Sequence, residues 1–133
     1  MTTTPDKTVW PMLNYLDAPA AIAFLVDAFG FEPSLVVNGE NDAIVEHAQL
    51  RWPEGGGVML GTANRVGNEF SMRPTGGGST YVVTDEPDRV YASALAAGAA
   101  LMRDMADEDY GSRGFSVRDA EGNIWGFGTY RGE

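Results

Sequence analysis

Apolar positions along the chain change their spacing at regular intervals, and each change predicts a new element. Asp17 is a good N-cap and Gly30 a typical residue after a helix. Between them, apolar residues recur at i, i+3, i+4 and i+7, which is the spacing of one helix face. These residues are Ile22, Leu25, Val26 and Phe29. Short apolar runs bounded by turn residues predict strands around this helix, at 9–16, 34–37, 43–51 and 58–62.

The second half of the chain begins the same order again. A strand is predicted at 79–84 and a helix at 85–98, with closing strands at 115–118 and 124–130. The polar stretch at 103–113 has no period, and we interpret it as a loop. Two further segments lack periodicity: residues 1–6, a predicted disordered lead-in, and the glycine-rich 67–78, a predicted linker. The chain is thus expected to be one domain, 1–133, with module one at about 7–66 and module two at about 79–131.

Subtraction of residue numbers supports an internal repeat. Asp17, Pro19 and Gly30 recur at an offset of 68, as Asp85, Pro87 and Gly98. Arg51, Glu54, Gly55, Gly61 and Thr62 recur at an offset of 67, as Arg118, Glu121, Gly122, Gly128 and Thr129. Eight matches at nearly constant offset indicate a duplicated β-α-β-β-β unit. The alternative is that any two such units share their caps and turns.

Composition removes several classes of function. The 133 residues contain 9 Lys and Arg against 19 Asp and Glu, which gives a formal charge of −10, with one histidine and no cysteine. Disulfides, Cys-ligated zinc, iron–sulfur clusters and thiol nucleophiles are therefore excluded. The acidity disfavours nucleic acid and anionic membranes as partners and favours cationic ligands. Without a membrane-spanning apolar run or a signal-like segment, we expect a soluble, cytoplasmic protein.

Two long segments carry a family resemblance. They are PMLNYLDAPAAIAFLVDAFGF at Pro11–Phe31 and YGSRGFSVRDAEGNIWGF at Tyr110–Phe127. Both resemble the vicinal oxygen chelate superfamily, which contains glyoxalases, bleomycin resistance proteins and extradiol dioxygenases. The resemblance covers nearly the whole chain, and its most specific part is the turn VRDAEGN. It implies an α+β fold in which two βαβββ modules form a curved mixed sheet around one cleft, commonly in a homodimer.

Enzymes of this family hold a divalent metal in the cleft through His, Gln or Glu side chains. The resemblance places the four ligand positions at Trp10, Met59, Ser79 (or Gly78) and Gly126. Met59 and Gly126 are related by the same offset of 67, so the repeat supports their equivalence independently. None of these side chains suits a hard cation. We therefore predict that the metal site of the family is lost and that no cofactor is required.

Strand alternation assigns residues to the cleft face. With Trp10 on that face, alternate residues of each strand share it, whereas Ala48, Leu50, Trp125 and Phe127 fall on the core face. Tyr110 and Arg113 flank the acidic run that the resemblance places at the cleft mouth. The candidate ligand-binding residues are Trp10, Met12, Asn14, His47, Gln49, Met59, Tyr81, Tyr110, Arg113 and Gly126.

Some of these candidates have two interpretations. His47 is either a general base or ligand hydrogen-bond partner, or a half-exposed strand histidine. Trp10 either fills the vacated metal position or provides a stacking surface for a flat ligand. The acidic run of Asp104, Asp107, Glu108 and Asp109 is either a solvated loop or a cluster that attracts a cation to the cleft.

The first functional hypothesis is a homodimeric binding protein that sequesters a hydrophobic or cationic small molecule, as bleomycin resistance proteins do, in a metal-free cleft. The alternative is a lyase or isomerase with His47 as base and Tyr81, Gln49 or Arg113 polarising the substrate. A third hypothesis is metal-dependent catalysis through other ligands, such as Glu46 with His47.

Overall fold

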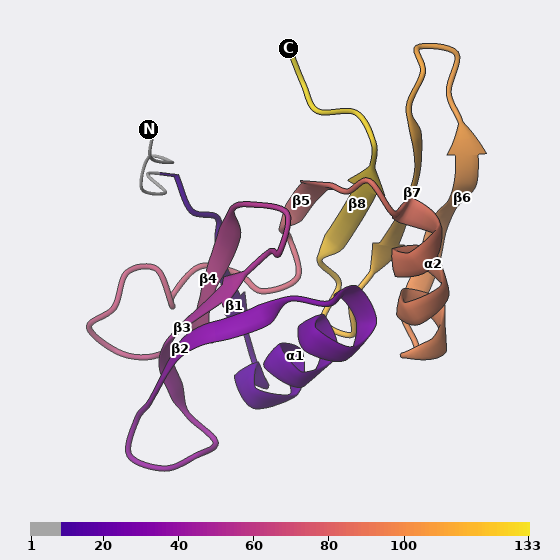
Figure 1. Ribbon diagram of the computed structural model, residues 1–133. Helices are drawn as coiled ribbons and strands as arrows, with labels where there is room; N and C mark the ends of the chain where they lie inside the picture. Colours follow the sequence, from indigo (N-terminus) through magenta and orange to yellow (C-terminus); the bar gives the residue numbers. More distant parts are fainter. Residues whose placement is uncertain (1–8) are drawn as a thin grey trace.

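Two similar modules follow one another along the chain (Figure 1). The computed structural model describes residues 9–133, so the prediction for residues 1–6 lies outside the described part. Module one consists of β1 (Met12–Tyr15), α1 (Ala18–Phe24), its continuation η1 (Leu25–Phe29), β2 (Glu32–Asn38), β3 (Val45–Arg51) and β4 (Gly57–Thr62). Module two consists of β5 (Ser79–Val83), α2 (Pro87–Ala96), β6 (Ala100–Asp107), β7 (Arg113–Arg118) and β8 (Ile124–Gly128). None of the helices in the described part has the length and apolar character needed to cross a membrane.

Each module forms one four-stranded mixed sheet, in the orders β1-β4-β3-β2 and β5-β8-β7-β6. The first strand of each module is parallel to the last, and the other pairs are antiparallel. The two sheets therefore have the same topology, as the internal repeat requires. The predicted α+β class and the two βαβββ modules are confirmed.

One prediction of local structure was wrong. The polar stretch interpreted as a loop contains much of the strand β6, which pairs with β7 through Arg103 opposite Ser116 and Asp107 opposite Arg113. Most residues of β6 are exposed because this strand is at the sheet edge. With no buried face there is no selection for alternating polarity, which explains the missing signal. The edge strand β2, exposed along its whole length, was likewise predicted too short.

The first helix begins and ends as its caps predict. The Asp17 carboxylate accepts a hydrogen bond from Ala20 N at 3.1 Å, and Gly30 has the left-handed φ of 96°. The last turn widens into a π-helix, which places Ala28 and Phe29 in the core. Of the predicted stripe, Leu25 and Phe29 are fully buried, whereas Ile22 and Val26 are only partly buried.

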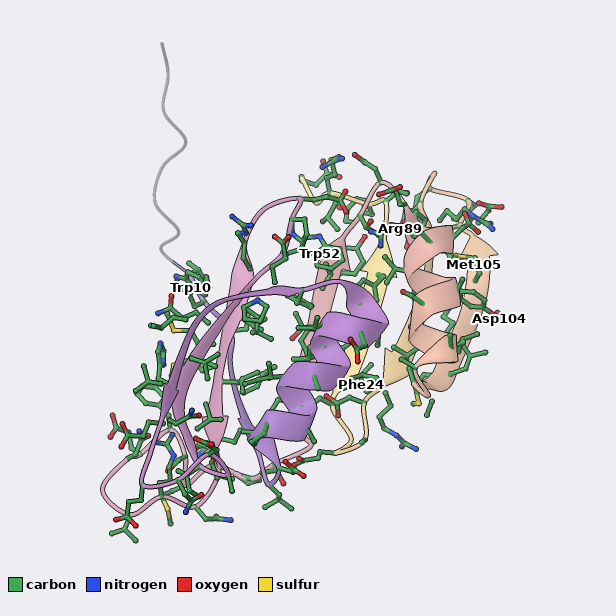
Figure 2. The ribbon with its side chains drawn as sticks, turned by 60° about the horizontal axis from the view of Figure 1, so that its bottom comes forward. Trp10, Phe24, Trp52, Arg89, Asp104 and Met105 are labelled. Atoms are coloured by element: carbon green, nitrogen blue, oxygen red, sulfur yellow. The ribbon has the colours of Figure 1, made fainter. Side chains whose placement is uncertain are left out.

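The helix-side faces of both sheets share one core. Phe29 lies 4.7 Å from Phe127 between ring centroids, and Phe31 lies 5.0 Å from Trp52. Trp125 is fully buried against the same rings, which confirms the core face predicted for Trp125 and Phe127. Figure 2 shows Trp52 between the two modules. Since the core lies between the modules, the opposite faces of the two sheets point away from it.

Two equivalent glutamates join the modules reciprocally. The Glu121 carboxylate in the β7–β8 turn accepts hydrogen bonds from the backbone nitrogens of Leu16, at 2.6 Å, and Asp17, at 2.9 Å. Its equivalent in module one, Glu54, accepts from Asp85 N at 2.8 Å and from Thr84 Oγ1 at 2.7 Å. Each module thus satisfies donors at the helix start of the other.

A buried carboxylate completes this joint. Asp119 Oδ2 accepts from the Tyr15 hydroxyl at 2.7 Å and from Trp125 Nε1 at 3.1 Å, while its Oδ1 accepts from Asn123 N at 3.0 Å. Burial and the adjacent carboxylate raise the pKa of Tyr15, so the phenol remains protonated and continues to donate. Asp119 therefore connects the end of β1 to the core of module two.

Asp119→Asn should lower the free energy of unfolding by about 2–3 kcal/mol, because the amide nitrogen cannot accept a hydrogen bond and charge-assisted bonds inside the core are lost. Urea denaturation followed by tryptophan fluorescence measures this change. Asp109→Asn, at an exposed turn position, is the matched control and should leave the midpoint unchanged. Equal midpoints for the two variants would contradict a structural role for Asp119.

Candidate ligand-binding site

The outward face of module one brings together five of the predicted residues. Met12 of β1 pairs with Met59 of β4, which pairs with Gln49 of β3. Asn14 and His47 lie on the same face by strand alternation. The residues that alternate with them along β3 and β4, such as Ala48 and Leu60, are buried in the core.

Trp10 lies at the end of this same face. Its ring carbon Cζ3 is 2.9 Å from the point where a Cβ of Gly57 would be, so the indole covers that glycine. In Figure 2 the Trp10 side chain is on the side of module one opposite to α1. The ring thus extends the apolar surface of Met12 and Met59 toward the start of β4.

Asn14 holds the linker against β1. Its carboxamide nitrogen donates to the carbonyl oxygen of Phe70, and lies 3.4 Å from that of Arg73. A cavity of about 190 Å³ remains between Met12, Asn14 and this segment. Because the amide donor is bound to the linker, Asn14 positions the chain here rather than offering a free donor to a ligand.

His47 contacts the neighbouring carboxamide on the same sheet face. Gln49 Nε2 lies 2.9 Å from His47 Nε2, and which of the two groups donates depends on the tautomer of the ring. No carboxylate of the described residues bonds to the ring, so His47 lacks the orienting acid that a general base normally has.

A hollow of about 430 Å³ occupies the outward face of module two. Its floor contains Gly114, Gly126 and Gly128, and the Tyr81 ring lies over the last two, within 3.5 Å of the points where their Cβ atoms would be. Its walls include three tyrosines, Tyr81, Tyr110 and Tyr130, of which the sequence predicted the first two. All its lining residues belong to module two, so the predicted site residues fall on two separate faces.

The tyrosine walls are held by direct contacts. The Tyr81 hydroxyl donates to the carbonyl oxygen of Tyr130 at 2.6 Å, and the rings of Tyr110 and Tyr130 meet edge to face at 5.8 Å. Partial burial raises the pKa of Tyr81, which keeps its hydroxyl protonated. Tyr130 was missed by sequence reasoning, although the i, i+2 spacing of Gly126 and Gly128 marks the open floor beside it.

Arg113 is not brought to either face. Its guanidinium turns toward α2, where Nη2 lies 2.8 Å from Asp88 Oδ1 and Nη1 lies 3.1 Å from Asp107 Oδ2. This pairing raises the pKa of Arg113 further above its usual range, and its hydrogen bond lowers the pKa of the Asp88 carboxyl. Arg113 thus holds Asp107, a carboxylate of the acidic run.

The acidic run is dispersed rather than clustered. Asp104 accepts a hydrogen bond from the Tyr91 hydroxyl at 2.5 Å, beside α2. Only Glu108 of the run lines the hollow, and Arg103 neutralises it in an ion pair. Figure 2 places Asp104 on the opposite side of the molecule from Trp10. The fold therefore does not gather these carboxylates into a cluster that could attract cations toward Trp10.

The residues at the family's metal positions do not fit a divalent cation. Trp10, Met59 and Gly126 offer an indole, a thioether and no side chain. Ser79 pairs with Ile124, the equivalent of Gly57 at the offset of 67, so the register makes Ser79 rather than Gly78 the equivalent of Trp10. Across residues 9–133, no three His, Asp or Glu side chains converge in a way that would hold a metal. The pair of Glu46 and His47, named above as alternative ligands, likewise belongs to no such group among these residues.

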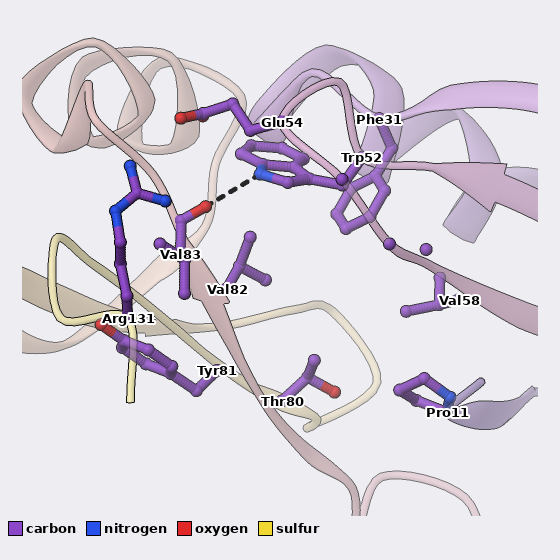
Figure 3. A pocket seen from close by; sticks show the side chains of 13 residues that line it. Pro11, Phe31, Trp52, Glu54, Val58, Thr80, Tyr81, Val82, Val83 and Arg131 are labelled. Atoms are coloured by element: carbon purple, nitrogen blue, oxygen red, sulfur yellow. Dashed lines mark hydrogen bonds between the residues drawn. The ribbon is translucent and has the colours of Figure 1, made fainter. Parts of the chain in front are cut away.

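A further cavity of about 240 Å³ lies between the modules (Figure 3). Trp52 forms one wall and donates from Nε1 to the carbonyl oxygen of Val83 at 3.0 Å. Glu54 and Arg131 also line it; Arg131 pairs with Asp85, and Glu54 bonds to the start of α2. Glu54 thus serves the joint between the modules, whereas the ion pair of Arg131 stays within module two. Among the predicted site residues only Tyr81 borders this space.

Arg113→Gln should raise the pKa of the Asp88 carboxyl toward its ordinary value, because the hydrogen bond that stabilises the carboxylate is removed. An NMR pH titration of the side-chain carboxyl carbons measures the change. Arg89→Gln removes the guanidinium that pairs with Glu86 near the start of the same helix, and it should leave the pKa of the Asp88 carboxyl unchanged. An Asp88 titration unaffected by Arg113→Gln would show that the ion pair does not persist in solution.

Comparison with known proteins gives one consistent result. TioX from Micromonospora sp. ML1 is similar in structure, with a TM-score of 0.72 and 28% sequence identity, over 91% of this chain and 98% of that chain. A glyoxalase-related enzyme from Fulvimarina pelagi aligns with a TM-score of 0.68 and 18% identity, over 93% of this chain and 88% of that one. A superfamily member from Sphaerobacter thermophilus DSM 20745 aligns with a TM-score of 0.63 and 20% identity, over 92% and 97%. At these lower identities the likeness concerns the fold alone.

Among curated proteins, no match was found. The model of the Glyoxalase/Bleomycin resistance protein/Dioxygenase superfamily matches residues 7–127, nearly the whole chain. Together with the two mixed sheets and their shared topology, this match settles the assignment. The chain belongs to the glyoxalase/bleomycin resistance protein/dioxygenase superfamily.

Proposed function

We propose that this chain binds a small molecule with a flat aromatic part, sequestering it without chemical change. The observation that carries the proposal is the hollow of about 430 Å³ on module two, with its glycine floor and tyrosine walls. This volume is in the range of small-molecule pockets, about 300–1,000 Å³. Bleomycin resistance proteins, which give the family part of its name, are a precedent for antibiotic binding without catalysis.

The glycine floor favours a flat ligand. Because Gly126 and Gly128 carry no Cβ, the Tyr81 ring lies over the strand, with Cδ1 3.5 Å and the hydroxyl oxygen 2.9 Å from the points where those Cβ atoms would be. A flat ligand in the hollow would therefore lie against Tyr81 and Tyr110, since aromatic pairs are stabilising in edge-to-face or offset geometries. Ser112 and Ser116 line the same hollow, and a serine hydroxyl can orient a polar group of the ligand.

The alternative, a lyase or isomerase using His47, has less support. The Nε2 atom of His47 is engaged by the carboxamide of Gln49, and Arg113 is engaged by Asp88 and Asp107. The residues assigned to polarise a substrate therefore do not gather around the imidazole. Tyr81, the remaining one, lines the hollow of the other module.

A homodimer would bring the two faces together. In one chain the faces point away from the shared core, and both expose apolar residues: Met12 is 47% exposed, Tyr81 51% and Ile124 39%. Packing module one of one copy against module two of another would cover these side chains and close the hollow. We therefore include the dimer in the proposal.

Gly126→Val should weaken binding of an uncharged bicyclic probe, 2-naphthamide, by about tenfold or more, which is about 1.4 kcal/mol. A Cβ at this position meets only Tyr81 Cδ1 at 3.5 Å, so the fold tolerates the change while the added methyl groups fill the floor. An NMR titration that follows the backbone amide signals of position 126 and of Gly128 gives the dissociation constant. Gly77→Ala, in open space, is the matched control. If both variants bind alike, the hollow is not the ligand site.

The wild-type chain should elute as a dimer, with twice the mass of a single chain by light scattering. Met12→Glu introduces a charge in the centre of the proposed contact and should give a monomer. Val66→Glu, at a residue just before the linker that is 97% exposed, should leave the mass unchanged. A wild type that is monomeric at about 50 µM would exclude the shared cleft, because a dissociation constant above that range is too weak for a stable dimer.

A further inference from the structure

A guanidinium lies on the outward face of module one. Arg65 follows β4 and folds back so that Nη2 is 2.7 Å from the point where a Cβ of Gly61 would be. Its Nε donates to the carbonyl oxygen of Thr62 at 2.7 Å, which fixes the side chain in this orientation. Gly61 is buried beneath it, and any larger residue there would displace the guanidinium. Backbone and side chain therefore hold Arg65 against the sheet face.

Arg65 differs from the other arginines in its electrostatic environment. Five arginines form ion pairs with carboxylates: Arg51, Arg89, Arg103, Arg113 and Arg131. Arg73 and Arg118 form none but are exposed to solvent. Arg65 is half-buried and, within residues 9–133, forms no ion pair, although the chain has 19 acidic residues against 9 basic ones. A partly desolvated guanidinium without a counterion is an unfilled site for an anion.

The surroundings of Arg65 indicate what kind of anion fits. The register pairs Gln49 with Met59 and Ala48 with Leu60; continued by one residue, it puts His47 opposite Gly61, on the sheet face that the guanidinium covers. Gln49 contacts only Nε2 of the imidazole, so a proton on Nδ1 would make the ring a second donor to an anion. Beside these donors lie apolar side chains, since Val37 pairs with His47 and Met12 pairs with Met59.

We infer that this face binds the carboxylate of an apolar acid, with Arg65 and His47 holding the carboxylate and Met12 and Met59 packing against the apolar body. The inference rests on the proposed function, because it specifies the charged group of a ligand bound between the two outward faces that the proposed dimer brings together. It replaces the cation expected from overall acidity. The net charge of −10 opposes anions at a distance, but salt limits that effect to about 8 Å at physiological ionic strength, whereas the guanidinium acts in direct contact.

Three probes test this inference on the intact protein: 2-naphthoate and 2-naphthamide, which share a ring system, and acetate, which carries the carboxylate without the rings. Binding of naphthoate should shift the NMR signals of the Gly61 amide and of Arg65 Nε–H. Its affinity at this site should be at least about tenfold higher than that of naphthamide, a difference of about 1.4 kcal/mol. Arg65→Gln should remove this difference. Arg118→Gln, which removes the same charge at an exposed unpaired position, should preserve it. If Arg65→Gln does not fold, Arg65→Lys, which lacks the bidentate fork, should still weaken naphthoate binding about threefold and leave naphthamide unchanged.

Two results would overturn the inference. One is equal affinity of naphthoate and naphthamide at Gly61, and the other is an equal loss in Arg65→Gln and Arg118→Gln. Acetate should produce the same shifts only at much higher concentration. If acetate bound as tightly as naphthoate, the apolar contacts with Met12 and Met59 would not contribute to binding, and that part of the inference would be wrong. The amide signals of Gly126 and Gly128 report the hollow separately, so failure of the proposed function is seen there while Gly61 and Arg65 report the carboxylate subsite.

Discussion

The arrangement of the whole molecule depends on the polar joint between its two modules. A glutamate in the turn before the last strand of each module, Glu54 or Glu121, binds backbone donors at the start of the other module's helix. These donors precede the first helical turn and would otherwise have no partner in the fold. Asp119 adds a buried acceptor for Tyr15 and Trp125. With the modules fixed in this way, their helix-side faces share one core and their other faces point outward.

The joint also shows where the repeat has diverged. Trp52 and Asp119 are equivalent by the offset of 67, yet the first is an indole that donates to Val83 O and the second a carboxylate that accepts from Tyr15. Both connect the modules, but with opposite hydrogen-bonding roles. The geometry of the duplication is therefore preserved where the chemistry is not, and equivalence of position does not predict equivalence of function.

What could be predicted from sequence follows from burial. Strands with one buried face alternate in polarity, so the core positions of Trp125 and Phe127 could be assigned. The strand β6 was not predicted, because both of its faces are largely exposed. Alternation also identified the outward residues of each sheet. It did not place Arg65 over Gly61 or turn Arg113 toward α2, because those orientations depend on loop conformation and on partners distant in sequence. Of the hollow, Tyr81, Tyr110 and Gly126 were among the predicted residues, but its shape was not predicted, because it depends on absent side chains, which a hydrophobic pattern does not report.

The outward faces carry different chemistry on the same scaffold. At equivalent positions, Met59 presents a thioether and Gly126 makes room for the ring of Tyr81, and neither residue takes part in the shared core. Replacing such a residue changes the surface offered to a ligand while removing few of the contacts that stabilise the fold. Core residues such as Trp125 cannot be replaced in this way, because a change of side-chain volume there disturbs the packing of every neighbouring ring. Substitutions on the outward faces, including those at the positions that the resemblance assigns to metal ligands, are therefore compatible with a stable fold. These faces carry a thioether and guanidinium surface on one module and a glycine and phenol surface on the other.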